Sequence, residues 1–288
     1  MKRITLVTDT NASLPKEIIE KYQIIEVPIH IQFSDETYVT GETIDDSKLF
    51  KLIDERSVIP TTAAPSPSAF EKAYQSALEK GAEQILCICC SGEVSATYNS
   101  AVMAMEHFPG TEIQVVDSRG LSLAEGFQVL AAAEAVEAGE EMDEIIKRLE
   151  DLRDRTVVYG ALPTLKYLAM GGRMGKLAAG FGNTLEIKPI LTLQDGKLEL
   201  LEKVRTWRKA KERLIELAVD KGKDAAIERV GLIHVNNEAG VLALYDEMKD
   251  ALNITLDPIL TEFTPGLSVH TGSGVIAFAM VLRKPAMD

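Results

Sequence analysis

The chain has 288 residues, and its 31 Lys and Arg against 44 Asp and Glu give a formal net charge of −13. This length allows two domains with substantial cores. The negative charge argues against wrapping of nucleic acid or binding to an anionic membrane surface, because phosphate groups repel it. No segment approaches the roughly 20 apolar residues of a membrane span. We therefore expect a cytoplasmic protein without stable membrane insertion.

Strand-like and helix-like segments alternate, the pattern of an α/β protein with a largely parallel sheet. The first half predicts strands over 4–8, 84–90 and 113–116, an extended segment over 24–33, a helix capped by Ser13, and helices over 69–79, from Ser95, and over 124–138. An acidic amphipathic helix over 142–152 then indicates a domain boundary. We expect an N-terminal α/β domain over 1–154.

The second half carries a local basic surplus. Between Pro163 and Lys211 there are ten Lys or Arg residues and four Asp or Glu residues. Asp195-Gly196, between two strand-like runs, predicts a hairpin. Further along, the pattern predicts a helix from Trp207, strands over 230–235 and 256–262, a helix over 238–252, and a final turn, Gly-rich loop and apolar stretch over 264–280. We expect a C-terminal α/β domain with a mixed sheet over 155–288, whose last segment returns to the domain interface, and a ligand site between the domains.

The three cysteines, Cys87, Cys89 and Cys90, crowd one strand-like segment. No cysteine elsewhere could pair with them in a disulfide framework, and a zinc site would need histidine ligands from elsewhere in the chain. The segment therefore favours a buried strand in which Cys acts as a small hydrophobic residue, and we expect no metal site.

Polar clusters follow several predicted strands, where the ligand crevice of an open α/β sheet lies. Asp9 reads as an Asx turn at least as well as a functional group. A hydroxyl at Ser95 either caps its own helix or joins the free amide groups in binding an anion, and spacing alone favours capping. His270 has small residues on both sides that let a ligand approach the backbone, which favours a functional role.

Catalytic motifs are poorly matched. The segment 266–270 has His270 where a nucleophile elbow needs glycine, and the Gly-rich segment 171–176 lacks the spacing of a phosphate loop. What remains is a crevice with hydroxyl groups, one His and several Arg, suited to holding an anion without breaking a bond. Two alternative functions stay open: a hydrolase or acyltransferase that uses Ser95 or Ser268 with His270, and a binding module for another small anion.

Seven motifs, in order along essentially the whole chain, closely resemble the DegV family of bacterial fatty-acid-binding proteins. They are 7–15, 62–66, 95–101, 116–118, 165–173, 188–191 and 269–272. The resemblance implies a two-domain α/β fold and a buried long-chain fatty acid as the only ligand, with no other cofactor. It also implies a non-enzymatic carrier that presents the carboxylate to a separate ATP-dependent fatty-acid kinase subunit, which makes acyl phosphate for phospholipid synthesis.

The resemblance also implies site residues. Thr62, Ser95 and His270 would hold the carboxylate, with Arg205 nearby as the charged partner. Arg173 and Gly272 are secondary candidates for lining the head-group pocket or the partner surface. The chain departs from the family pattern at 63–64, 92–93 and 96, which leaves these residues in place but alters the loops around them.

Overall fold

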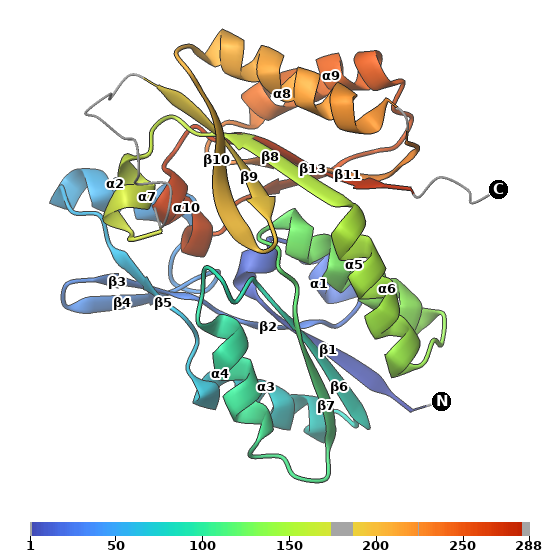
Figure 1. The fold of residues 1–288 in the computed structure, drawn as a ribbon. Helices are drawn as coiled ribbons and strands as arrows, with labels where there is room; N and C mark the ends of the chain where they lie inside the picture. The colour runs from blue at the N-terminus through green and yellow to red at the C-terminus, as the bar shows by residue number, and fades with distance from the viewer. Residues whose placement is uncertain (1, 174–186, 224, 284–288) are drawn as a thin grey trace. The chain divides into compact units, whose positions relative to one another are not determined.

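The computed structural model describes residues 2–173, 187–223 and 225–283 (Figure 1). Contacts group them into two units. The first takes residues up to 44, 62–154 and 195–197, and the second takes 45–61 and the remaining described residues. Each unit is thus discontinuous in sequence, because residues 45–61 group with the second unit and residues 195–197 with the first.

The first unit contains a parallel sheet in the order β2-β1-β6-β7. Its strands are β1 (Ile4–Asp9), β2 (Ile25–Val27), β6 (Gln84–Cys89) and β7 (Glu112–Asp117). Every residue of β6 is buried, as its continuous apolar run requires of a central parallel strand. The carboxyl ends of β1 and β6 therefore lie side by side, followed by the polar residues that the sequence singled out.

Helices connect these strands. They are α1 (Lys16–Lys21), α3 (Pro67–Glu79), α4 (Thr97–Met105), α5 (Leu123–Glu137) and α6 (Met142–Arg155). Ser66 caps α3 by accepting a hydrogen bond from the Ala69 N–H at 3.3 Å. The prediction that Ser13 caps a helix is wrong. Ser13 adopts a left-handed conformation at the end of a 3-10 turn over Thr10–Ala12, and α1 begins at Lys16, directly after Pro15. The predicted Ala-rich helix is confirmed as α5, which is buried along most of its length.

A second, small sheet has the order β4-β3-β5. It consists of β3 (His30–Phe33), β4 (Glu36–Val39) and β5 (Thr61–Ala63). Helix α2 (Asp46–Arg56), which the sequence analysis did not predict, belongs to the second unit. Asp45 caps α2 through a hydrogen bond from the Lys48 N–H at 2.8 Å.

The second unit is built on a mixed sheet in the order β10-β9-β8-β13-β11-β12. The strands are β8 (Thr156–Ala161), β9 (Lys188–Gln194), β10 (Lys197–Val204), β11 (Ile227–His234), β12 (Ile259–Glu262) and β13 (Ile276–Leu282). β13 runs antiparallel to both neighbours, whereas β11 and β12 are parallel. The predicted α/β class, with one parallel and one mixed sheet, is thus confirmed.

Two long helices, α8 (Trp207–Gly222) and α9 (Glu238–Leu252), lie together on one face of this sheet (Figure 1). Their apolar faces and the central strand β13 form one core, in which Leu214, Val241 and Phe278 are fully buried. Two shorter helices, α7 (Lys166–Met170) and α10 (Pro265–Thr271), contact each other. The turn expected near residue 264 is in fact α10.

Within the described residues, no helix combines the length and the apolar character needed to cross a membrane.

Candidate functional site

Ser95 lies in the loop between β6 and α4, half-buried. Its Oγ accepts a hydrogen bond from the Thr97 N–H at 3.3 Å and lies 2.8 Å from Thr97 Oγ1. Ser95 is therefore not the N-cap of α4, a position that Ala96 occupies without a side-chain cap, but its hydroxyl bonds the first residue of the helix. When Thr97 donates in the hydroxyl pair, Ser95 keeps its own hydrogen for a ligand.

The beginning of this loop is held in place by residues 195–197 of the same unit. The buried Ser91 hydroxyl donates to the Gly196 carbonyl at 2.7 Å, and the Ser91 carbonyl accepts the Ser95 N–H at 3.1 Å. Lys197 lies 3.5 Å from the Glu93 carboxylate. Ser95 therefore stands on a loop that is fixed by several hydrogen bonds.

Thr62, the second predicted hydroxyl ligand, is a half-buried residue of β5 and belongs to the first unit with Ser95. The other predicted site residues, Arg173, Arg205 and His270 together with Gly272, belong to the second unit.

His270 lies on α10 and is 8% exposed. A Cβ atom added to Gly171 would lie 2.2 Å from the His270 Nδ1, so only glycine leaves room for this imidazole. Gly272, two residues after His270, has φ +81° and lies against the ring of Tyr167. A Cβ atom added to Gly272 would lie 2.6 Å from two carbons of that ring. Two motifs far apart in the sequence thus form one cluster.

Burial, with a smaller contribution from the positive charge of Arg173, lowers the pKa of His270 from 6.5 to about 4. His270 is therefore neutral at neutral pH and carries one ring N–H that can donate to a carboxylate. The guanidinium of Arg173 is exposed and donates to the Gly171 carbonyl at 2.6 Å. The structure brings Arg173, His270 and Gly272 together.

Arg205 follows β10 directly, and its side chain is exposed. Among the residues that the structure describes, no hydrogen bond or ion pair joins Arg205 to His270. The sequence-based grouping of these two residues therefore stays a prediction.

A buried polar pair that the sequence analysis did not identify involves Ser268, on the same helix as His270. The Ser268 hydroxyl donates to Asp46 Oδ1 at 2.5 Å, and both residues are buried. Burial raises the pKa of Asp46 to about 7; the Ser268 hydrogen bond opposes this shift, and the negative charges of Glu262 and Asp45 add to it. Ser268 lies inside α10 rather than on a strand-to-helix turn, so the geometry of a nucleophile elbow is absent there. Because α2 was not predicted, nothing in the sequence pattern placed Asp46 next to α10.

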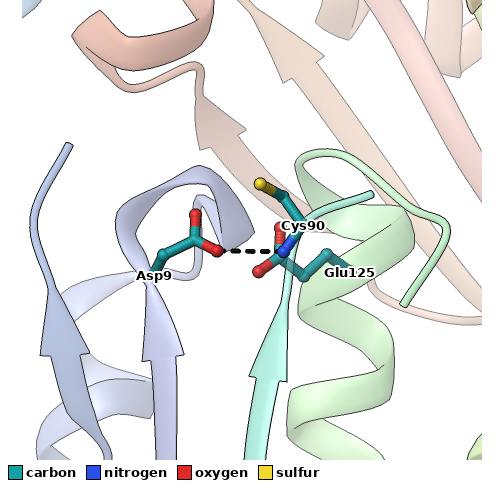
Figure 2. Close-up of side chains that lie close together, drawn as sticks. All are labelled: Asp9, Cys90 and Glu125. Carbon is teal, nitrogen blue, oxygen red and sulfur yellow. Dashed lines mark hydrogen bonds between the residues drawn. The ribbon is translucent and has the colours of Figure 1, made fainter. Parts of the chain in front are cut away.

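A second unpredicted cluster lies in the first unit, where Figure 2 shows Asp9, Cys90 and Glu125 close together. Asp9 Oδ1 accepts the Asn11 N–H at 3.0 Å, which confirms the Asx turn. Asp9 Oδ2 accepts the Cys90 N–H at 2.9 Å. Burial raises the pKa of all three side chains. An acidic residue, Glu125, at the start of an Ala-rich helix was the sequence signal that could have indicated this cluster.

Comparison with known proteins places the whole chain in one family. The family model described as "Uncharacterised protein, DegV family" matches residues 3–283. A DegV domain-containing protein of Streptomyces coelicolor is 34% identical over 282 residues, which cover 98% of this chain and 99% of that protein.

Solved structures agree with this match. A fatty-acid-binding DegV family protein from Thermus thermophilus has a TM-score of 0.91 and 32% identity, covering 98% of this chain and 100% of its own. DegV from Bacillus subtilis, described as a fatty acid binding protein, has a TM-score of 0.89 and 28% identity over 98% of this chain and 100% of its own. The order of the seven motifs, the two α/β units and these matches lead to one conclusion: the chain belongs to the DegV family.

Proposed function

We propose that this protein binds a long-chain fatty acid and presents its carboxylate to a separate ATP-dependent kinase subunit. In the bacterial cytoplasm, that subunit forms acyl phosphate for phospholipid synthesis. The observation that supports the ligand class is the match, over 98% of the chain, to DegV structures described as fatty-acid-binding. The kinase partner follows from the family resemblance in the sequence motifs.

In this proposal the acyl tail supplies most of the affinity. Each methylene withdrawn from water contributes about 0.8 kcal/mol, so a long chain contributes on the order of 10 kcal/mol before the costs of ordering and association. A carboxylate gains nothing from an apolar surrounding, so it needs hydrogen-bond donors wherever it leaves water.

The head group would be held by Thr62, Ser95 and His270, with Arg205 as a positive charge. The neutral state of His270 suits this role, because its ring N–H donates a hydrogen bond without the cost of burying an imidazolium before the ligand arrives. The space that Gly171 leaves for the ring fixes the direction of that bond. Donors of this kind determine which end of the fatty acid is presented.

Phosphoryl transfer to a carboxylate requires little chemistry from the carrier. A carboxylate oxygen attacks the γ-phosphorus of ATP, the bond to the bridging oxygen breaks, and ADP leaves with the electron pair. The carboxylate is already ionised, so no general base is needed. A carrier without catalytic residues of its own is therefore sufficient.

The central experiment is organic extraction of purified protein followed by mass spectrometry, with rebinding of fatty acids to the stripped protein. Fatty acid in the extract and saturable rebinding are expected. Absence of both would contradict the proposal. A covalent adduct with a serine-reactive fluorophosphonate would instead favour the hydrolase alternative, and stabilisation by sugar phosphates but not by fatty acids would favour a small-anion module.

His270→Ala tests the head-group role, with His107→Ala as the matched control because His107 is exposed and pairs with Glu71 within the first unit. Loss of one charge-assisted hydrogen bond costs about 1.5–3 kcal/mol, so we expect at least a tenfold loss of affinity or of acyl-phosphate formation in His270→Ala alone. Equal behaviour of the two variants would contradict the role.

A further inference from the structure

Asp9, Cys90 and Glu125 form a closed cluster, here called the buried acidic-thiol cluster. All three residues are 0% exposed, and one ligand atom from each lies within 4.8 Å of the others. Asp9 ends β1, Cys90 follows the adjacent strand β6, and Glu125 lies in the first turn of α5. Three regular elements thus hold the side chains toward one point, as Figure 2 shows.

The hydrogen bonds within the first unit leave part of this cluster unsatisfied. Glu125 Oε1 accepts from the Thr8 hydroxyl at 3.2 Å, but Glu125 Oε2 is buried and has no hydrogen-bond partner among the described residues. No Lys, Arg or His of the described chain forms an ion pair with these carboxyl groups. The Asp9 and Glu125 carboxyl groups also interact: after burial, the negative charge of Asp9 is the next cause that raises the pKa of Glu125. Two buried carboxyl groups in contact need a proton or a cation between them, and a cation would also satisfy the open oxygen.

Asn11 provides an independent indication. Its Nδ2 donates to Cys90 Sγ at 3.4 Å, so its amide lies against the thiol of the cluster. Its Oδ1 is buried and also lacks a hydrogen-bond partner in the described part of the chain. The Asn11 amide group therefore contacts the cluster through Nδ2 and carries a second buried oxygen atom without a partner, in addition to Glu125 Oε2.

We propose that Asp9, Cys90 and Glu125 bind a zinc ion, and that the Asn11 amide turns over, so that Oδ1 replaces Nδ2 beside the cluster and becomes the fourth ligand. The set combines a thiolate with oxygen donors, and Zn²⁺ binds both Cys sulfur and Asp or Glu oxygen and is almost always four-coordinate in structural sites. Ca²⁺ and Mg²⁺ prefer all-oxygen shells, so the thiol selects against them. A divalent cation also reduces the charge of three ionised ligands from −3 to −1.

A zinc ion at this site would stabilise the first unit at the start of the loop between β6 and α4, which carries Ser95. Cys90 directly precedes Ser91, which starts the loop that carries Ser95. Zinc would join the ends of β1 and β6 to the first turn of α5 and fix the base of that loop. This role is structural, and it is independent of which anion the protein binds.

Cobalt substitution tests the proposal directly, because Co²⁺ bound to a thiolate gives a charge-transfer absorption. The full-length protein is purified without chelator, analysed for metals, stripped, and titrated with Co²⁺ and then Zn²⁺. We expect about one zinc per chain after purification or reconstitution, and a cobalt–thiolate band that Zn²⁺ removes. Cys90→Ala should lose the band and Cys87→Ala should keep it, because the Cys87 thiol packs in the apolar core of β6.

Glu125→Gln keeps the shape of the side chain and removes its charge, so it tests the site even if Cys90→Ala does not fold. We expect its zinc affinity to fall at least tenfold. The proposal is overturned if folded wild-type protein neither contains zinc nor gives the cobalt band. It is equally overturned if Cys87→Ala loses the cobalt–thiolate band while Cys90→Ala keeps it, or if Glu125→Gln binds zinc as tightly as the wild type.

Discussion

At the scale of single residues, Asp46 links the stability of the second unit to pH. Its pKa is about 7 in the folded protein and about 3.9 in an unfolded chain. Between these values the folded state binds more protons, so the free energy of unfolding falls as the pH rises through this window. A shift of this size corresponds to about 4 kcal/mol.

Asp46→Asn keeps an oxygen acceptor for Ser268 and removes the titration. We expect the variant to be more stable than the wild type above pH 7, with a flatter dependence of stability on pH. Urea unfolding at pH 5 and pH 8 measures this. Asp54→Asn, an exposed change on the same helix, is the control and should keep the wild-type slope. Parallel slopes for wild type and Asp46→Asn would refute the assignment.

Gly171 controls the position of His270 by its lack of a side chain. Its backbone is right-handed, with φ −77°, so alanine meets no backbone strain there and conflicts mainly with the imidazole. Overpacking of this kind costs about 1–3 kcal/mol. We expect Gly171→Ala to lower the melting temperature and weaken fatty-acid binding. In the His270→Ala background the same change should have little effect on stability, and an undiminished effect there would show that the imidazole is not the partner.

The pKa of His270 depends on the nearby charge of Arg173 and should also depend on a bound carboxylate. Replacing Arg173 with Gln removes a positive charge that lowers the pKa of His270, so the pKa should rise from about 4 in the ligand-free variant. A bound carboxylate favours the imidazolium and should raise the pKa further in the wild type. NMR titration of the imidazole, with and without fatty acid, measures both shifts. An unchanged pKa on saturation would place the carboxylate away from His270.

At the scale of elements, the sequence predicts those strands, helices and turns that leave a local pattern of apolar residues or turn residues. Continuous apolar runs identified β1 and β6, and Asp195-Gly196 predicted the β9–β10 hairpin, whose turn residues have φ 49° and 78°. Helix α10 was missed because it has seven residues and contains Pro265 and Gly266, which read as a turn. The Asp46–Ser268 pair was missed for a different reason: contacts between elements leave no local periodicity.

The hairpin turn gives a test at this scale, because Gly196 is constrained in two ways. Its φ of +78° disfavours a side chain, and an added Cβ would lie 2.6 Å from Ser91 Oγ. Gly41 has φ +80° with open space around it and therefore isolates the backbone effect. We expect Gly41→Ala to cost about 1 kcal/mol and Gly196→Ala clearly more, by denaturant unfolding. Equal losses would mean that the Ser91 contact contributes nothing.

At the scale of the whole molecule, the negative net charge of the protein contrasts with the negative charge of its proposed ligand. A charge of −13 opposes binding to anionic surfaces, yet the proposed ligand is itself an anion. The residues predicted to hold its carboxylate come from both units, with Thr62 and Ser95 in the first and His270 and Arg205 in the second. The motifs predicted the identity of these residues, whereas the structure alone joined the 171–173 and 270–272 motifs, because that contact depends on the packing of α7 against α10.

Removal of the ligand should lower the stability of the folded protein. A ligand that binds only the folded state adds RT ln(1 + [L]/Kd) to the free energy of unfolding, about 2.7 kcal/mol at one hundred times Kd. We expect the stripped protein to melt at a lower temperature and added fatty acid to restore it. The fatty alcohol of the same length is the control: it keeps the tail and lacks the carboxylate, so it should stabilise less. Equal stabilisation by the two would mean that the polar residues contribute nothing to binding and that the apolar tail alone is recognised.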